Sequence, residues 1–131
     1  MKYAIIFLLT LSVLIYGCSR GSNIIVDFQK MDSDLSSIAS VTYDCNWVGG
    51  GNTIKCTGII SNNAQDKIIE LNPRMVVLDS NECLMNCSDE ANIGNINPGQ
   101  KIDYTLSCIV PQKQNVKIIL LPQGGFWISK C

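Results

Sequence analysis

Hydrophobic residues follow two patterns along this chain. Residues 3–15 form a nearly continuous apolar run that begins after Lys2 and is interrupted only by Thr10 and Ser12. From residue 41 onward, short apolar or alternating runs are separated by turn-forming Gly, Asn, Asp and Pro residues, a spacing typical of an all-β sandwich or barrel. The expected strands cover residues 41–47, 53–61, 67–78, 101–110, 116–121 and 126–129.

The clearest alternation follows an Asn-Pro-Gly turn in the second half of the chain. Ile102, Tyr104, Leu106 and Cys108 share one face, and polar residues occupy the positions between them, as in a strand with one buried face. A second turn, at Gly50-Gly51, suits a two-residue hairpin between the first two expected strands.

The segment between the two patterns is polar and rich in Ser and Asp. Residues 18–40 are therefore expected to form a tether that holds the folded part clear of lipid headgroups. The apolar residues near Ile24 are compatible with a short strand, and those near Leu35 with a helical turn. We expect the domain to begin at Val41, so that residues 41–131 form one domain, in keeping with a chain of 131 residues.

The N-terminal run has the order of a secretory signal, in which a positive start and an apolar stretch precede a small residue at the cleavage site. Its length of about 15 residues is short of the roughly 20 that a membrane-spanning helix needs. Ile15, Gly17 and Cys18 resemble the lipobox of bacterial lipoproteins, with an aliphatic residue at −3, Gly at −1 and Cys at +1. The resemblance implies that residues 1–17 are a signal peptide and that Cys18 carries fatty acyl chains such as palmitate.

A lipid on Cys18 would anchor the chain to a membrane of the cell envelope. Two or three acyl chains, at about 0.8 kcal/mol per buried CH₂, give effectively permanent anchoring. Ser19 follows the cysteine, and the lack of Asp at this position is similar to lipoproteins of the Gram-negative outer membrane. The expected location is therefore the outer membrane in a Gram-negative cell, with the domain facing the periplasm or the exterior.

Beyond Cys18 the chain has an even number of cysteines, which indicates disulfide bonds in a protein that is exported. They are Cys45, Cys56, Cys83, Cys87, Cys108 and Cys131. Six cysteines allow 15 pairings, but a hairpin turn at Gly50-Gly51 places Cys45 opposite Cys56. The leading set of pairs is 45–56, 83–87 and 108–131. The alternative joins 56 with 108 and 45 with 131.

No residues have a catalytic or metal-binding spacing. The chain contains no His, which removes the commonest general base and metal ligand. Four carboxylates, Asp79, Glu82, Asp89 and Glu90, could pair for acid–base catalysis or bind Ca²⁺, but they lack the spacing of a calcium loop and are expected to aid solubility. We therefore expect no enzymatic activity, no metal and no cofactor.

Charge excludes one class of partner. The formal net charge is −1, and no run of like charge occurs. Nucleic acid is therefore not an expected partner, because its binding requires a clustered positive charge. The sequence gives no indication of the oligomeric state.

The stretch from Thr53 to Val110 resembles the bacterial FxLYD domain. The resemblance is carried by residues 57–62 (TGIISN), 75–81 (MVVLDSN), 93–100 (IGNINPGQ) and Tyr104. These are a Gly-containing strand that ends in Asn, a strand that ends in an Asp turn, and a Pro-Gly turn before an aromatic-bearing strand. Met75 and Leu78 stand where the family has aromatic residues. The resemblance implies a small Ig-like β-sandwich of about seven strands without catalytic residues.

The expected function is that of a lipid-anchored, non-enzymatic binding or assembly module for a protein partner in the envelope. Contact is expected through the loops Val48–Asn52, Ser80–Asn92 and Pro122–Trp127, with Trp47 and Trp127 either as interface anchors or as covers of the core. The alternative is an inhibitor or exclusion lipoprotein. The size, the anchor and the Tyr43-Asp44-Cys45 sequence are similar to periplasmic lysozyme inhibitors, and small lipoproteins also perform phage superinfection exclusion.

Overall fold

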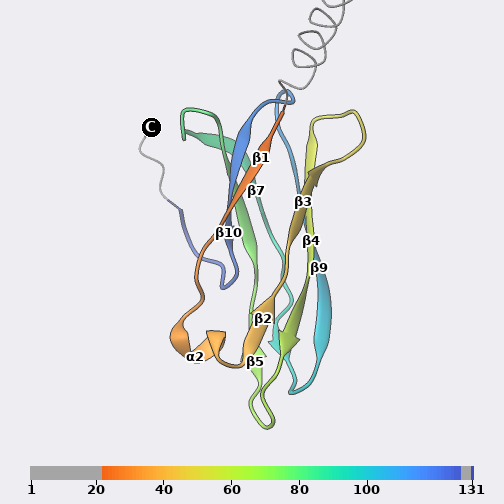
Figure 1. The fold of residues 1–131 in the computed structure, drawn as a ribbon, viewed down its shortest axis with the longest axis vertical. Helices are drawn as coiled ribbons and strands as arrows, with labels where there is room; N and C mark the ends of the chain where they lie inside the picture. Colours follow the sequence, from red (N-terminus) through yellow and green to blue (C-terminus); the bar gives the residue numbers. More distant parts are fainter. Residues whose placement is uncertain (1–21, 128–130) are drawn as a thin grey trace, which may run out of the picture.

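The computed structural model describes residues 22–127 and residue 131, which fold into a mostly β structure (Figure 1). The expected signal peptide and the lipidation site Cys18 lie outside the described residues. The elements in chain order are β1 (Ile24–Phe28), α2 (Ser33–Ser36), β2 (Ala39–Val41), β3 (Asp44–Trp47), β4 (Thr53–Asn62), β5 (Ile69–Glu70), β6 (Arg74–Leu78), β7 (Leu84–Glu90), β8 (Asn95–Ile96), β9 (Lys101–Ile109) and β10 (Val116–Leu121).

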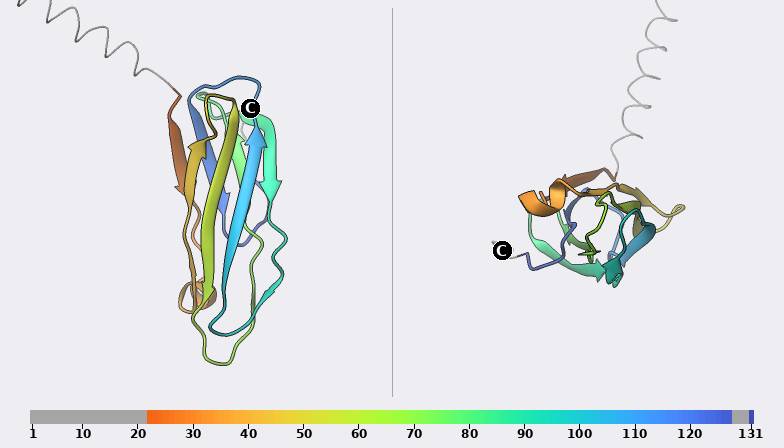
Figure 2. Two further views of the ribbon diagram at one scale, coloured as in Figure 1. Left: turned by 90° about the vertical axis from the view of Figure 1, so that its right-hand side faces the viewer. Right: turned by 90° about the horizontal axis from the view of Figure 1, so that it is seen from below.

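Two four-stranded sheets build most of the molecule (Figure 2). In the first sheet the order is β1-β10-β6-β7, with β1 parallel to β10 and the other neighbours antiparallel. In the second sheet, β4 pairs along one edge with β2 and β3 and along its other edge with β9, always antiparallel. The short strands β5 and β8 form a further antiparallel pair.

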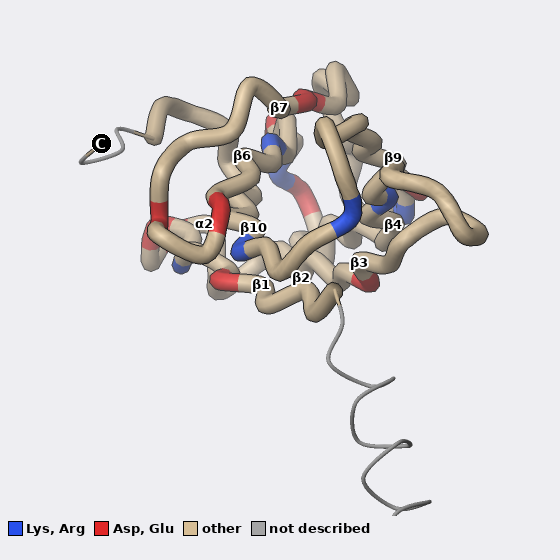
Figure 3. The backbone as a smooth tube through the Cα atoms, turned by 90° about the horizontal axis from the view of Figure 1, so that it is seen from above, with Lys and Arg blue, Asp and Glu red and all other residues tan. Residues whose placement is uncertain are grey.

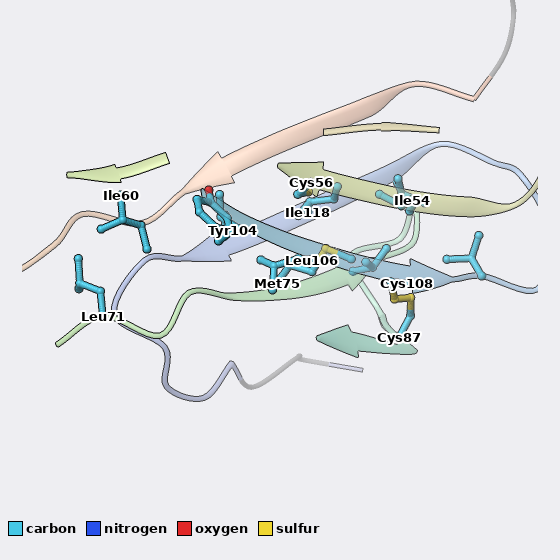
Figure 4. Packing of buried hydrophobic residues seen from close by; sticks show 14 of the residues in the cluster. Ile54, Cys56, Ile60, Leu71, Met75, Cys87, Tyr104, Leu106, Cys108 and Ile118 are labelled. Atoms are coloured by element: carbon cyan, nitrogen blue, oxygen red, sulfur yellow. A yellow bond between two sulfur atoms is a disulfide. The ribbon is translucent and has the colours of Figure 1, made fainter. Parts of the chain in front are cut away.

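A hydrophobic core is formed by buried side chains from both sheets (Figure 4). Ile54 and Leu106 contribute from the second sheet, and Met75 and Ile118 from the first, all without exposed surface. The alternation expected along β9 is confirmed, because every second residue from 104 to 108 is buried. The two sheets are therefore held together mainly by burial of apolar surface, the dominant favourable contribution to folding.

β6 and β10 are nearly continuous apolar strands because both of their faces are covered. Ile118 faces the core, whereas Ile119 packs on the opposite side with Val76 and Leu78. Trp127, from the segment that follows β10, packs against this outer cluster. We call residues 122–127 the C-terminal strap, since they cover the outer face of the first sheet.

The segment expected to be a tether takes part in the fold from residue 24 onward. Ile24, Val26 and Phe28 pack against the core, and β1 pairs with β10 along its whole length. Ala39 in β2 is buried and pairs with Asn62. The described part of residues 18–40 is therefore an edge of the domain rather than a free spacer, because side chains from both β1 and β2 pack into the core.

Three other sequence predictions need correction. The strand expected at residues 67–78 is divided into β5 and β6. Pro73 lies between them and has no backbone N–H to donate within a sheet. The side chain of Asn72 accepts hydrogen bonds from the N–H groups of Ile93 and Gly94 at this break. The loop expected at Ser80–Asn92 contains β7, whose alternation is hard to see because its inward-facing positions carry only Met85, Cys87 and Asp89. The strand expected at residues 126–129 is absent at 126 and 127, and the rest lies outside the described residues.

Three disulfides join the six described cysteines. Cys45–Cys56 is confirmed and links directly opposed residues of β3 and β4. The expected pairs 83–87 and 108–131 are wrong, and the structure has Cys83–Cys131 and Cys87–Cys108 instead. The alternative set is wrong as well. Residues four apart along extended chain are separated by about 13 Å, well beyond the roughly 7 Å limit between the Cα atoms of a disulfide, so 83 cannot reach 87.

The backbone between β2 and β3 lies unusually close to β4 and β9. The hydroxyl of Tyr104 donates a 2.6 Å hydrogen bond to the carbonyl oxygen of Thr42. A Cβ atom at Gly58 would stand only 1.9 Å from the same oxygen, so glycine is required for this approach. Burial raises the pKa of Tyr104 to about 12, and the nearby Tyr43 adds to the shift. These residues fix the path of the edge strand.

Candidate functional site

The described chain begins at one end of the molecule, which we call the apical end (Figure 1). It comprises residues 22–25, the turns 48–52 and 79–83, and the loop 110–115. The indole Nε1 of Trp47 donates a 2.9 Å hydrogen bond to the carbonyl oxygen of Ser22. The backbone N–H of Asn23 donates to Asn115 Oδ1, also at 2.9 Å. The chain therefore enters the fold at a fixed position between the two sheets.

The turn 48–52 and the loop 110–115 support each other. The N–H of Val110 donates to the carbonyl oxygen of Asn52 at 3.0 Å, and the Asn52 side chain donates back to the carbonyl oxygen of Val110. The ammonium group of Lys113 lies 5.7 Å from the ring centroid of Trp47, within the range of a cation–π contact. Trp47 thus acts as a structural link between the chain entry and this loop, and its half-buried ring packs against the core.

The two carboxylates of the turn 79–83 contact other groups of the fold. Asp79 Oδ1 accepts hydrogen bonds from the N–H groups of Asn81 (2.9 Å) and Cys83 (3.0 Å), as in an Asx turn. Glu82 forms a 3.2 Å ion pair with Lys117 on β10. The side chain of this Glu is 71% exposed, so the pair contributes little to stability.

The four carboxylates singled out in the sequence do not meet at one site. Asp89 accepts a 2.9 Å hydrogen bond from the N–H of Ser107 and so joins β7 to β9, far along the strand from the turn at Asp79. Within residues 22–127 and 131, no group of three or more His, Cys, Asp or Glu residues could hold a metal ion. Asp79 and Asp89 accept backbone hydrogen bonds within the fold, whereas Glu82 forms an exposed ion pair.

The apical end also carries exposed apolar side chains from both sheets. We call them the apical apolar set: Ile25 (64% exposed), Val48 (46%), Leu84 (50%) and Ile109 (70%). The backbone register places them level with one another. Ile25 pairs with Lys117, Lys117 with Leu78, and Leu78 with Leu84 across the first sheet.

In the second sheet, Thr53 is the residue that brings Val48 and Ile109 to the same end. Its carbonyl oxygen accepts a 2.9 Å hydrogen bond from the N–H of Val48, and it pairs with Ile109. The four apolar side chains therefore lie near the apical end of their respective sheets.

A second exposed surface lies on the C-terminal strap. Phe126 is 90% exposed, and the guanidinium group of Arg74 lies 5.7 Å from its ring centroid. Arg74 also donates a 2.7 Å hydrogen bond from Nη1 to the carbonyl oxygen of Gly125. Beside them, Trp127 and the start of β7 line a shallow hollow of about 260 Å³. We call Arg74, Phe126 and Trp127 the strap patch.

The sequence pointed to some of these residues and missed others. Trp127 covers the outer face of the first sheet, as the core interpretation expected, yet its Nε1 is buried and has no hydrogen-bond partner among the described residues. Phe126 lay in an expected loop but was not singled out. Arg74 was missed, because a charged residue at the start of an apolar strand gives no local signal of an aromatic neighbour some fifty residues away.

Comparisons with known proteins leave the family open. A scan against protein-family models found no match to this chain, and a search of curated proteins found none either. Among residues 22–127 and 131, no helix has the length and apolar character needed to cross a membrane.

Proposed function

We propose that this chain is a lipid-anchored lipoprotein of the cell envelope that binds a protein partner and catalyses no reaction. The observation that carries the proposal is the position of Ser22. It is bound to Trp47 at the apical end and lies only four residues after Cys18, the expected lipidation site. A lipid on Cys18 would thus hold a disulfide-braced β domain directly at a membrane surface. Disulfide bonds suit an extracytoplasmic location, where thiols become oxidised.

We further infer that the fold is an Ig-like β-sandwich of the FxLYD type. Two four-stranded sheets around one core support this assignment. The residues behind the resemblance have structural roles here. Gly58 permits the close approach of Thr42, and Tyr104 donates a hydrogen bond to it. Ig-like sandwiches commonly serve as rigid supports for binding surfaces on their loops and edges.

The strap patch is the surface that we propose for the protein partner. Aromatic residues and Arg dominate the binding energy of protein interfaces. The guanidinium group of Arg74 lies beside the exposed ring of Phe126, and the adjacent Trp127 packs against the first sheet. The patch therefore combines apolar area with a positive charge.

Anchoring is tested with Cys18→Ala in the full chain. The unmodified protein should partition with membranes, and mass spectrometry should find it without residues 1–17 and with acyl chains on Cys18. The variant should lose the acyl mass and leave the lipidated fraction. An unacylated thiol at position 18 in the unmodified protein would reject the proposal.

Partner binding is tested by photo-crosslinking in intact cells. A photoreactive amino acid replaces Phe126 in one strain and Ile68, which is exposed at the opposite end, in a control strain. We expect one discrete crosslinked band from position 126 that is absent at position 68 and disappears with Arg74→Ala. Equal bands at both positions, or none at 126, would argue against the strap patch as the binding surface.

A further inference from the structure

The chain that connects the expected lipid to the folded domain is short. Four residues, even fully extended, span at most about 14 Å. Ser22 cannot move independently of the domain, because its carbonyl oxygen is held by Trp47 and the next residue is bound to the loop 110–115. If Cys18 is embedded by its acyl chains, as the proposed function states, the apical end must lie next to the membrane.

The side chains at that end suit an apolar surface. Ile109 and Val48 project from the second sheet, and Ile25 and Leu84 from the first, each with close to half or more of its surface exposed. Four of the eight large apolar side chains that are exposed among the described residues lie at this end. These side chains therefore lie around the chain entry, at the end of the domain that the short connection holds next to the membrane.

Charge does not oppose this contact. The turn 48–52 contains no charged residue, and the loop 110–115 contains only Lys113. Figure 3 looks onto the apical end and shows that uncharged positions predominate there. The carboxylate of Glu82 is paired with Lys117, and Asp79 accepts two backbone hydrogen bonds. Lys113 can face the phosphate groups of anionic lipids.

We propose that the apical end rests on the membrane that carries the lipid anchor, with the apical apolar set in contact with the lipid interface. The opposite end, formed by the loop 63–68 and the turn 97–100, then points away from the membrane. β4 runs between the two ends over ten residues, which corresponds to about 30 Å. The strap patch lies on the side of the domain between them, open to a partner in the same membrane or in the adjacent space.

The test measures which end of the domain lies close to lipid. The full chain is matured in cells so that Cys18 can be acylated, purified, and reconstituted into vesicles of phosphatidylethanolamine and phosphatidylglycerol with brominated acyl chains, which quench nearby Trp fluorescence. Ile109→Trp adds a probe at the apical end and Ile68→Trp a matched probe at the opposite end, since both side chains are more than half exposed. The unmodified chain gives the background from Trp47 and Trp127.

We expect the added fluorescence of Ile109→Trp to be quenched at least twofold more than that of Ile68→Trp. Equal quenching, stronger quenching at position 68, or none above background at either position would overturn the inference. As a second measurement, the unmodified chain is labelled with a lipid that carries a photoreactive acyl chain. Labelled peptides should come from residues 48–52 and 109–115, and labelling mainly of residues 62–69 would also overturn it.

Flotation of the vesicles separates this inference from the proposed function. A chain that floats and yet shows no quenching at position 109 is anchored but held away from the bilayer, which rejects only the inference. A chain that does not float lacks the anchor, which rejects the proposed function and with it the inference.

Discussion

At the scale of single residues, Gly58 is the position with the least space. A side chain there would overlap the carbonyl oxygen of Thr42 at 1.9 Å and the ring of Tyr104 at 2.8 Å. We expect Gly58→Ala to destabilise the domain by about 1–3 kcal/mol, because backbone atoms must move to admit the methyl group. Urea unfolding with the disulfides intact measures the effect.

Gly50→Ala is the matched control for this substitution. A Cβ atom at Gly50 meets nothing within 4 Å, and the change should alter the unfolding free energy by less than about 0.5 kcal/mol. Equal effects at the two positions would mean that the close approach at Thr42 is not what makes glycine necessary at position 58.

Tyr104 gives stability a dependence on alkaline pH. Burial raises the pKa of its hydroxyl to about 12, whereas an unfolded Tyr titrates near 10. Between these values the folded state binds more protons than the unfolded state. The stabilisation is therefore complete below about pH 10 and is lost as the pH rises toward 12.

Tyr104→Phe tests this linkage. At neutral pH the variant should be less stable by about 1 kcal/mol, because the hydrogen bond to Thr42 is lost. Above about pH 10 it should lose less stability than the unmodified protein, and the late step in the absorbance titration of tyrosinate should disappear. Identical pH profiles would contradict the assignment of the shifted group.

At the scale of elements, a strand could be predicted from the sequence when one of its faces is clearly apolar and the other clearly polar. β9 could be predicted because apolar residues alternate with charged or hydroxyl side chains along it. β7 could not, since its inner face carries only Met85, Cys87 and Asp89, and its pairing with β6 comes from distant chain. The apolar residues near Ile24 indicate a short strand, and β1 forms there, but its pairing with β10 could not be predicted because the polar segment around it resembles a linker.

The sequence indicates the C-terminal strap only through the strand that it covers. The continuous apolar run of β10 requires a cover on both faces, and Trp127 supplies part of the outer one. We expect Trp127→Ala to cost about 2 kcal/mol and to increase the binding of an apolar fluorescent dye, because Val76 and Ile119 become exposed. Unfolding curves and dye fluorescence measure the two effects.

Phe126→Ala is the control for the strap. Phe126 is adjacent to Trp127 but 90% exposed, so its removal should leave the stability within about 0.5 kcal/mol of the unmodified value. If both substitutions destabilise the domain equally, the strap is held by something other than the packing of Trp127.

At the scale of the whole molecule, the disulfides show what local sequence cannot predict. Cys45–Cys56 follows from a single hairpin, and this local geometry was sufficient. Cys87–Cys108 joins edge strands of the two sheets (Figure 4). Cys83–Cys131 joins the apical turn to residue 131. Both depend on how the sheets meet. The strap patch and the apical apolar set were unpredictable for the same reason, since each combines residues that only the tertiary fold brings together.

The length of chain between Cys18 and Ser22 decides how the domain stands on the membrane. Four isolated apolar side chains give weak contact by themselves, so the short connection must keep the apical end at the surface. Inserting twenty Gly and Ser residues between Gly21 and Ser22 gives a connection with a root-mean-square span of roughly 25 Å. We expect this variant to remain in the membrane fraction while lipid quenching of Ile109→Trp falls at least twofold. Unchanged quenching would mean that the apical end binds lipid without help from the short connection.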